Sequence, residues 1–196
     1  MEEKKYASTV PACGMIISLL IFAQIPIMFG KADVNAIIYA MPWLLSAFPV
    51  LLLCIAFMFK NGEFVDATLN SILSGVLMGQ NFVRGIIALA LYGRGAEVTA
   101  ELVMSSYAID KWVYLTGGII LLFACWLAHF QSKMAAVGIF AGAAGFLALA
   151  AMYAGFGQVF GLVGAASLVI LGVYLLYSGL AGLLNTAMGK SVLPLK

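Results

Sequence analysis

The amino-acid sequence predicts an all-α integral membrane protein with six transmembrane helices and both termini in the cytoplasm. The first observation is composition: of 196 residues, 64% are hydrophobic and 9% are charged, whereas a soluble domain carries roughly a quarter charged residues. The second is pattern, because six apolar stretches each reach the roughly 20 residues that a helix needs to cross a bilayer. The third is the distribution of basic residues, which favours one orientation.

The six apolar stretches follow one another with short connections. They cover residues 11–29, 35–59, 64–93, 111–130, 134–155 and 159–184. Pro42 and Pro49 lie inside the second stretch, where membrane helices tolerate proline and often bend at it. Residues 94–108 form the longest expected loop, and residues 1–9 and 187–196 form short cytoplasmic tails. We therefore expect residues 1–196 to be a single transmembrane domain, with no soluble domain and no cleaved signal peptide.

Basic residues set the expected orientation, since cytoplasmic loops are enriched in lysine and arginine. With the N-terminus inside, six lysines are cytoplasmic and three basic residues are outside. The cytoplasmic residues are Lys4, Lys5, Lys60, Lys133, Lys190 and Lys196, and the outer ones are Lys31, Arg94 and Lys111. The expected location is the inner (plasma) membrane, crossed several times.

The third stretch carries a polar stripe on one side. Its members are Asp66, Asn70, Ser74, Asn81 and Arg84, which fall within an arc of about 80° on a helix. Ionisable groups inside a membrane cost at least a few kcal/mol unless they face a bundle interior or water. The stripe should therefore be covered by other helices.

Each residue of the stripe also has a purely structural interpretation. Arg84 can pair with Asp110 or Glu101, or extend to the outer headgroups. Asp66 can stabilise the inner end of its own helix. Asn70 and Ser74 can hydrogen-bond to neighbouring helices. The sequence leaves these alternatives beside a role in solute passage.

Small residues are dense in the fifth and sixth stretches. Gly138 and Gly142 form a GxxxG pair, and such residues let membrane helices approach closely. Packing within one protomer is one interpretation. Packing between protomers, or the lining of a pore, is the other.

Several functional classes lack the residues they require. The net charge is +2 with no dense basic tract, which excludes nucleic acid as an expected partner. Cys13, Cys54 and Cys125 are far apart in apolar stretches, and His129 is the only histidine, so neither a metal site nor a cofactor is expected. With no nucleophile–base pair or carboxylate cluster, an enzyme is not expected. Solute passage remains, in which amide and hydroxyl groups replace water around a carboxylate and Arg84 attracts the anion.

The C-terminal run YSGLAGLLNTAMGKSVLP resembles the signature that closes the acetate uptake transporter family, which includes the bacterial succinate–acetate permeases. Its matching residues are Tyr177, Leu184, Asn185 and the run from Gly189 to Pro194; sparser matches are Ile37, Ile38, Ala40, Met41, Lys60, Phe64, Ser71 and Ser74. The resemblance implies six helices per protomer, assembly into a homohexamer, and a pathway for small monocarboxylates through each protomer. It also implies proton-coupled uptake, with channel-like passage as an alternative.

The same resemblance implies pathway residues. Ile17, Ile72 and Gly142 occupy the positions at which the family narrows its pore with phenylalanine, tyrosine and leucine, and Ser71 and Tyr177 are further pathway candidates. Because these bulky side chains are missing here, a larger or less polar solute, or a differently placed gate, is an alternative. Ile72 lies about 120° or more from the polar stripe. If Ile72 faces the pathway, the stripe faces other helices or a neighbouring protomer.

The leading hypothesis is a transporter or channel for small monocarboxylates such as acetate, with succinate as a further substrate and proton-coupled uptake. A channel for small neutral solutes, such as urea, amides or undissociated acids, is the second hypothesis. A non-transporting membrane subunit is the third. The expected partners are a small carboxylate, the lipid bilayer and further copies of the chain.

Overall fold

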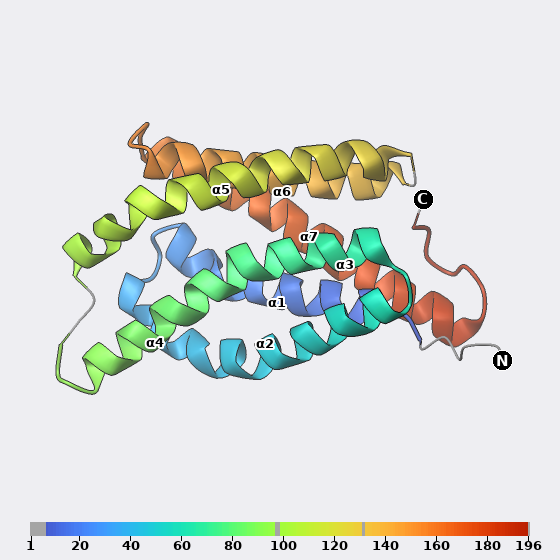
Figure 1. Ribbon diagram of the computed structural model, residues 1–196, viewed down its shortest axis with the longest axis horizontal. Helices are drawn as coiled ribbons and strands as arrows, with labels where there is room; N and C mark the ends of the chain where they lie inside the picture. Colours follow the sequence, from blue (N-terminus) through green and yellow to red (C-terminus); the bar gives the residue numbers. More distant parts are fainter. Residues whose placement is uncertain (1–6, 97–98, 131, 196) are drawn as a thin grey trace.

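The computed structural model describes residues 7–96, 99–130 and 132–195, which form a helical bundle without β-strands in those ranges (Figure 1). Six helical spans within this part of the chain are long and apolar enough to cross a membrane. The fold class predicted from composition and pattern is therefore confirmed. Which side of the membrane each end faces stays a prediction.

The spans are built from seven α-helices. These are α1 (Val10–Met28), α2 (Ile37–Lys60), α3 (Phe64–Leu73), α4 (Gln80–Tyr92), α5 (Ala100–His129), α6 (Lys133–Tyr153) and α7 (Gln158–Met188). A short 3-10 helix, Val34–Ala36, precedes α2. A π-helical segment, Ser74–Gly79, joins α3 to α4, and these three pieces together form the third span.

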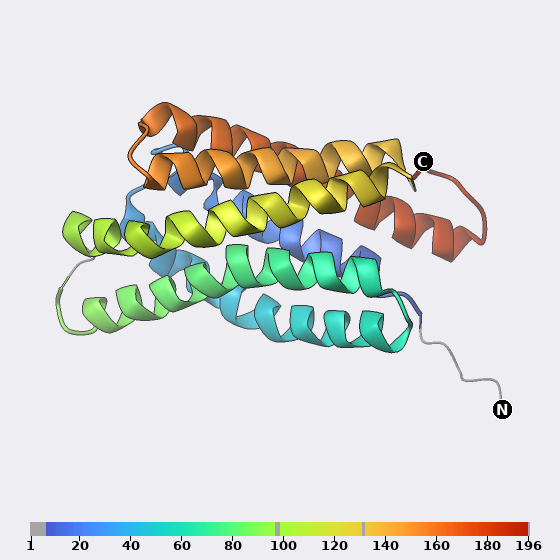
Figure 2. The ribbon, with the colours of Figure 1, turned by 45° about the horizontal axis from the view of Figure 1, so that its top comes forward.

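The spans run up and down along the long axis of the bundle (Figure 1, Figure 2). We call the end at which α1 begins and α7 ends the terminal end, and the opposite end the loop end. The turn 61–63, the end of α5 and the start of α6 lie at the terminal end, and the connections 29–36 and 154–157, the end of α4 and the start of α5 lie at the loop end. Because the number of spans is even, the first span begins and the last span ends at the same end of the bundle.

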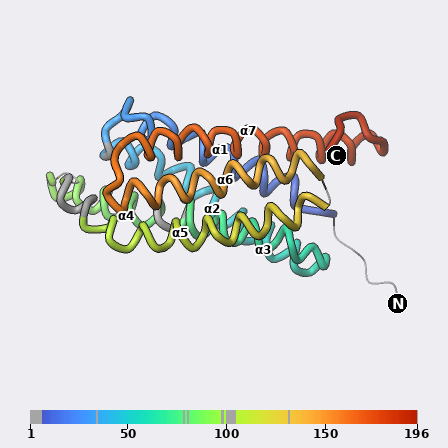
Figure 3. Tube along the Cα trace, turned by 90° about the horizontal axis from the view of Figure 1, so that it is seen from above, coloured from blue at the N-terminus to red at the C-terminus, as the bar shows by residue number. Residues whose placement is uncertain are grey.

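The spans close into a ring. Helix α5 packs on α6, α6 on α7, α7 on α1, and α1 on α2, which in turn supports the third span (Figure 3). The third span meets α5 only sparsely, so this seam is the thinnest part of the wall. Small residues explain the closest contacts. A Cβ atom on Gly138 would lie 2.2 Å from the ring of Tyr174, and one on Gly164 would lie 2.9 Å from Leu149.

These contacts bear on the GxxxG pair. Both Gly138 and Gly142 face side chains of α7, because a Cβ atom on Gly142 would lie 3.0 Å from Leu171. The dense glycines of α6 and α7 therefore serve packing within the chain, which was the first of the two interpretations.

Two features of the fold differ from the prediction. The expected loop 94–108 is wrong over much of its length, because α5 begins at Ala100. Its polar residues suggested a loop, but a helix satisfies its own backbone hydrogen bonds and continues past the apolar core. The third span was expected to be regular, and it contains the π-helical segment instead. Neither departure changes the number of spans.

Candidate functional site

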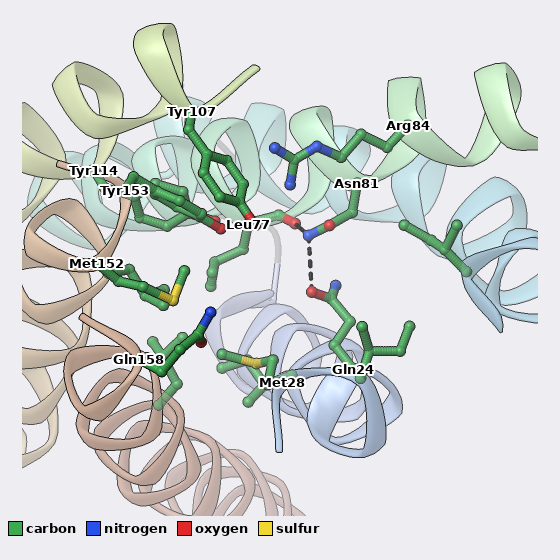
Figure 4. Close-up of a pocket in the computed structure, with 16 residues that line it drawn as sticks. Gln24, Met28, Leu77, Asn81, Arg84, Tyr107, Tyr114, Met152, Tyr153 and Gln158 are labelled. Atoms are coloured by element: carbon green, nitrogen blue, oxygen red, sulfur yellow. Dashed lines mark hydrogen bonds between the residues drawn. The ribbon is translucent and has the colours of Figure 1, made fainter. Parts of the chain in front are cut away.

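A cavity of about 240 Å³ opens in the loop-end half of the bundle, and we call it the loop-end cavity (Figure 4). Five spans contribute its polar lining: Gln24 from α1, Asn81 and Arg84 from α4, Tyr107 and Tyr114 from α5, Tyr153 from α6, and Gln158 from α7. Burying so many polar groups without a partner is costly. A structural core of this size would be expected to be apolar.

Arg84 extends from α4 toward the tyrosines and crosses the seam to α5 (Figure 4). Its Nη2 atom donates to Asp110 Oδ2 as an ion pair and to Ser106 Oγ at 2.7 Å. Ser106 Oγ in turn donates to Asp110 Oδ2 at 2.9 Å. The side chain of Arg84 is 28% exposed and that of Asp110 only 10%. The pair therefore joins a cation at the cavity wall to a carboxylate behind it.

Tyrosine rings and amides complete the loop-end cavity. The ring of Tyr153 packs on those of Tyr107 and Tyr114, with centroids 4.5 Å and 5.4 Å apart. On the opposite wall, Asn81 Nδ2 donates to Gln24 Oε1 at 2.8 Å (Figure 4). The lining thus offers both hydrogen-bond donors and acceptors around one paired cation.

A second, smaller cavity of about 70 Å³ lies in the terminal-end half, and we call it the terminal-end cavity. Its polar lining comes from Asp66 and Asn70 of α3 and from Tyr174 and Ser178 of α7. Asp66 stands in the first turn of α3, where the helix dipole favours a carboxylate. Val10 and Gly14 of α1 line the opposite side.

An apolar layer separates the two cavities. It consists of Ile17 and Phe146, which line neither cavity, and of Leu73, Leu121 and Leu171, which also form a wall of the terminal-end cavity; each is at most 5% exposed and all five belong to one core cluster. On α1, Gly14 lines one cavity and Ile21 the other, and Ile17 lies between them. On α6, Ile139 and Leu149 have the same relation, and Phe146 lies between them. The five spans that line the terminal-end cavity therefore also line the loop-end cavity, to which α2 adds Ile37, and they supply the layer between the two.

The structure places four of the predicted site residues at the cavities or the apolar layer. Asp66 and Asn70 line the terminal-end cavity and Arg84 lines the loop-end cavity. Ile17 lies in the apolar layer. Gly142 adjoins it, since a Cβ atom there would lie 3.0 Å from Leu171 and 3.6 Å from Leu121.

The other predicted site residues lie elsewhere. Ser71 donates to the backbone of Ala67 and Ser74 to that of Asn70, so both serve their own helix. Ile72 is half-buried and lines neither cavity. Tyr177 donates to the carbonyl of Pro194 at 2.9 Å. Of the two faces of the third span, the polar stripe rather than the Ile72 side faces the cavities.

Sequence reasoning missed five of the seven polar residues of the loop-end lining. Gln24 and Gln158 carried a usable signal, because an amide inside or beside an apolar stretch is costly unless it is partnered. Tyr107 carried none, since it fell in the expected loop. Tyr114 and Tyr153 lay near span ends, where tyrosine is commonly an interfacial anchor.

The C-terminal run that carries the family resemblance folds back as a clamp. Asn185 Oδ1 accepts from the backbone of Val192 at 2.6 Å and of Leu193 at 2.9 Å, and Asn185 Nδ2 donates to Leu193 O at 2.8 Å. Ser132 Oγ donates to the carbonyl of Leu195 at 2.8 Å. We call residues 189–195, held in this way against α7 and the turn before α6, the C-terminal clamp.

Comparisons of the chain with protein-family models, with curated proteins and with solved structures find no match. The family resemblance of the C-terminal run therefore stays a prediction. Within the described residues, no cluster of three or more histidine, cysteine or carboxylate side chains could hold a metal ion. The two cavities are the features from which a function can be argued.

Proposed function

We propose that this protein is a multi-pass membrane transporter or channel for small monocarboxylates such as acetate. The observation that carries the proposal is the pair of cavities, one toward each end of the bundle, which share five lining spans and are separated by one apolar layer. Polar groups inside a membrane bundle commonly mark a solute pathway. Opening the apolar layer would join the two cavities into a continuous route.

The loop-end cavity supports the choice of solute. Its volume of about 240 Å³ accommodates a solute of a few non-hydrogen atoms. Arg84 can present a planar fork of N–H groups to a carboxylate. Gln24 and Tyr153 add neutral donors, which can replace water around the carboxylate oxygens without holding the ion too tightly. Succinate is a further candidate from the resemblance alone.

Orientation, coupling and assembly belong to the same proposal. With both termini in the cytoplasm of a cell with an inner membrane, the loop-end cavity faces outward and the terminal-end cavity faces the cytoplasm. Proton coupling and a homohexamer follow from the resemblance of the C-terminal run. The C-terminal clamp keeps that run ordered at the terminal end.

The direct test is uptake of labelled acetate, propionate, lactate and succinate into proteoliposomes, with empty liposomes as the control for permeation of undissociated acid through lipid. We expect saturable acetate uptake that unlabelled propionate reduces by competition. Protein-dependent flux that is absent for all four solutes would overturn the proposal. Retained uptake without a pH gradient, and without a response to one, would indicate a channel rather than proton-coupled transport.

A channel for small neutral solutes is the second candidate, and one observation favours it. Arg84 is the only charged side chain among the described residues that line the loop-end cavity, and Asp110 already neutralises it. A site with no net charge suits urea, an amide or an undissociated acid. Stopped-flow swelling with urea and acetamide separates the candidates, because permeability confined to carboxylates would exclude the neutral-solute channel.

A further inference from the structure

Arg84 and Asp110 differ in how far each reaches into the loop-end cavity. Arg84 lines the cavity, whereas Asp110 lies behind it among α5 residues and is more deeply buried. One nitrogen of the guanidinium, Nη2, holds both Asp110 and Ser106. A guanidinium has five N–H donors. A solute in the cavity can therefore reach the remaining N–H groups of Arg84 while Asp110 is still bound.

The charge of Asp110 depends on this partner. A carboxylate inside a membrane bundle is stable in its charged form only when it is paired and hydrogen-bonded, and it otherwise takes up a proton. Among the described residues, four groups face Asp110. Arg84 of α4 forms the ion pair with it, Tyr153 of α6 interacts with it electrostatically, and Ser106 and Tyr114 lie on its own helix. The lining residues Gln24 of α1 and Gln158 of α7 do not titrate.

Resting on the transport function proposed above, we propose that Arg84 exchanges partners: an incoming monocarboxylate replaces Asp110 on the guanidinium, and Asp110 takes up one proton. The bound solute adds one negative charge and the proton adds one positive charge, so the site stays neutral. One O–H bond forms on Asp110 and one O–H bond breaks in the hydronium ion that delivers the proton from the solution, which leaves neutral water. Release of the solute reverses both steps.

The neighbours of Asp110 suit both of its forms. Ser106 Oγ donates to the charged carboxylate at 2.9 Å, and the same hydroxyl can accept a hydrogen bond from the protonated form, because a hydroxyl is both donor and acceptor. The seam between α4 and α5 is sparsely packed, so the guanidinium can shift without disturbing a dense core. The exchange also explains how the loop-end cavity can bind a carboxylate although the Arg84–Asp110 pair has no net charge when the cavity is empty.

A permanent ion pair that only fastens α4 to α5 makes the opposite prediction. Its members would keep their charges when solute binds, and binding would take up no proton. Removing Asp110 would then lower stability and leave the pH dependence of binding unchanged. Proton uptake on binding is therefore the quantity that separates the two roles.

The experiment measures the affinity of detergent-solubilised protein for labelled acetate at several values between about pH 6 and about pH 8, where acetate, with an ordinary carboxyl pKa near about 4 to 5, stays ionised. Uptake of one proton makes the affinity of the wild type fall about tenfold per pH unit. In Asp110→Asn the affinity should be independent of pH and, at the upper end of the range, higher than in the wild type. Arg84→Gln should bind no acetate.

Two further variants serve as controls. Asp110→Glu keeps a carboxylate and should restore the pH dependence. Asp33→Asn removes a carboxylate from the exposed α1–α2 connection and should keep the wild-type profile. If Asp110→Asn fails to fold, the wild-type slope still decides whether binding takes up a proton, and a flat slope overturns the exchange.

The outcomes distinguish this inference from the proposed function. A flat wild-type profile with retained acetate flux, or a slope that persists in Asp110→Asn, would overturn the partner exchange and leave transport standing. Absence of both flux and binding would overturn the two together. A slope near one proton that vanishes in Asp110→Asn and returns in Asp110→Glu supports the exchange.

Discussion

Gly138 is the residue at which α6 and α7 approach most tightly. A Cβ atom there would lie 2.2 Å from the ring of Tyr174, closer than two carbon atoms can pack. We predict that Gly138→Ala forces the helices apart and lowers the free energy of unfolding by about 1–3 kcal/mol, as overpacking of a core commonly does. Thermal unfolding in detergent, followed by tryptophan fluorescence, measures the effect.

Gly75 provides the matched control for this substitution. It also lies in a helical span, but a Cβ atom there would meet no atom within 4 Å. Replacing a helical glycine by alanine without a clash stabilises by about 0.5–1 kcal/mol. Equal melting temperatures for Gly138→Ala and Gly75→Ala would show that the close approach of α6 and α7 has no energetic importance.

At this scale the sequence indicated the partners of Arg84 but could not choose among them. A charge inside an apolar stretch requires a counter-charge, which named Asp110 and Glu101 as candidates. The choice depended on α5, because Asp110 faces Arg84 only when the helix continues through residues that resembled a loop. For the same reason Tyr107 lines the cavity and Ser106 bonds to Arg84.

Among the elements, the third span departs most from a regular helix. The wide turns of the π-helical segment Ser74–Gly79 disturb the regular pairing of backbone carbonyls. Side chains bond to two carbonyls around it: Ser74 Oγ donates to Asn70 O, and Asn81 Nδ2 donates to Leu77 O. Hydrophobic periodicity does not register a single wide turn, so the sequence predicted a regular helix here.

The C-terminal clamp is the element whose stability depends on one side chain. Asn185 makes three of its hydrogen bonds. We predict that Asn185→Ala releases residues 189–195, because each lost hydrogen bond contributes roughly 0.5–1.5 kcal/mol. Faster amide exchange at Val192 and Leu193, and faster trypsin cleavage after Lys190, would record the release.

Thr186→Ala is the control for the clamp. Thr186 Oγ1 donates to Gly182 O within α7 and holds no residue of the clamp. Exchange at Val192 and Leu193 should stay at the wild-type rate in this variant. Protection that survives in Asn185→Ala would show that other contacts, such as those of Tyr177 and Ser132, hold the clamp by themselves.

For the whole molecule, the apolar layer determines whether the two cavities communicate. Phe146 is its largest side chain and is fully buried. We predict that Phe146→Ala raises the initial rate of acetate uptake into proteoliposomes severalfold, because loss of the ring opens space through the apolar layer. The same change should lower the free energy of unfolding by about 3–5 kcal/mol, so uptake is compared at equal amounts of folded protein.

Phe140→Ala is the matched control on the same helix. Phe140 is 55% exposed on the outer face of α6, and in a bilayer this face contacts lipid. Its removal should leave both uptake and thermal stability close to wild type. Folded Phe146→Ala protein with an unchanged uptake rate would contradict a route through the apolar layer.

The fold class was predictable at this scale because it depends on sums over the chain. Composition and the lengths of apolar stretches are sufficient for six spans. The cavities depend instead on the register of five spans against one another, which brings Asn81 opposite Gln24 and Ile17 level with Phe146. No periodicity within a single stretch contains that information.

Helix α1 starts where α7 stops, at one end of the bundle, while α4 ends and α5 begins at the other. A short flexible linker can therefore join the two chain ends, and new ends can be cut between α4 and α5. The six rods would keep their neighbours in such a circular permutant, yet its tails would emerge on the opposite side of the membrane. A reporter domain that fluoresces on only one side of the membrane, fused to a chain end, would then give opposite signals in the native and the permuted chain.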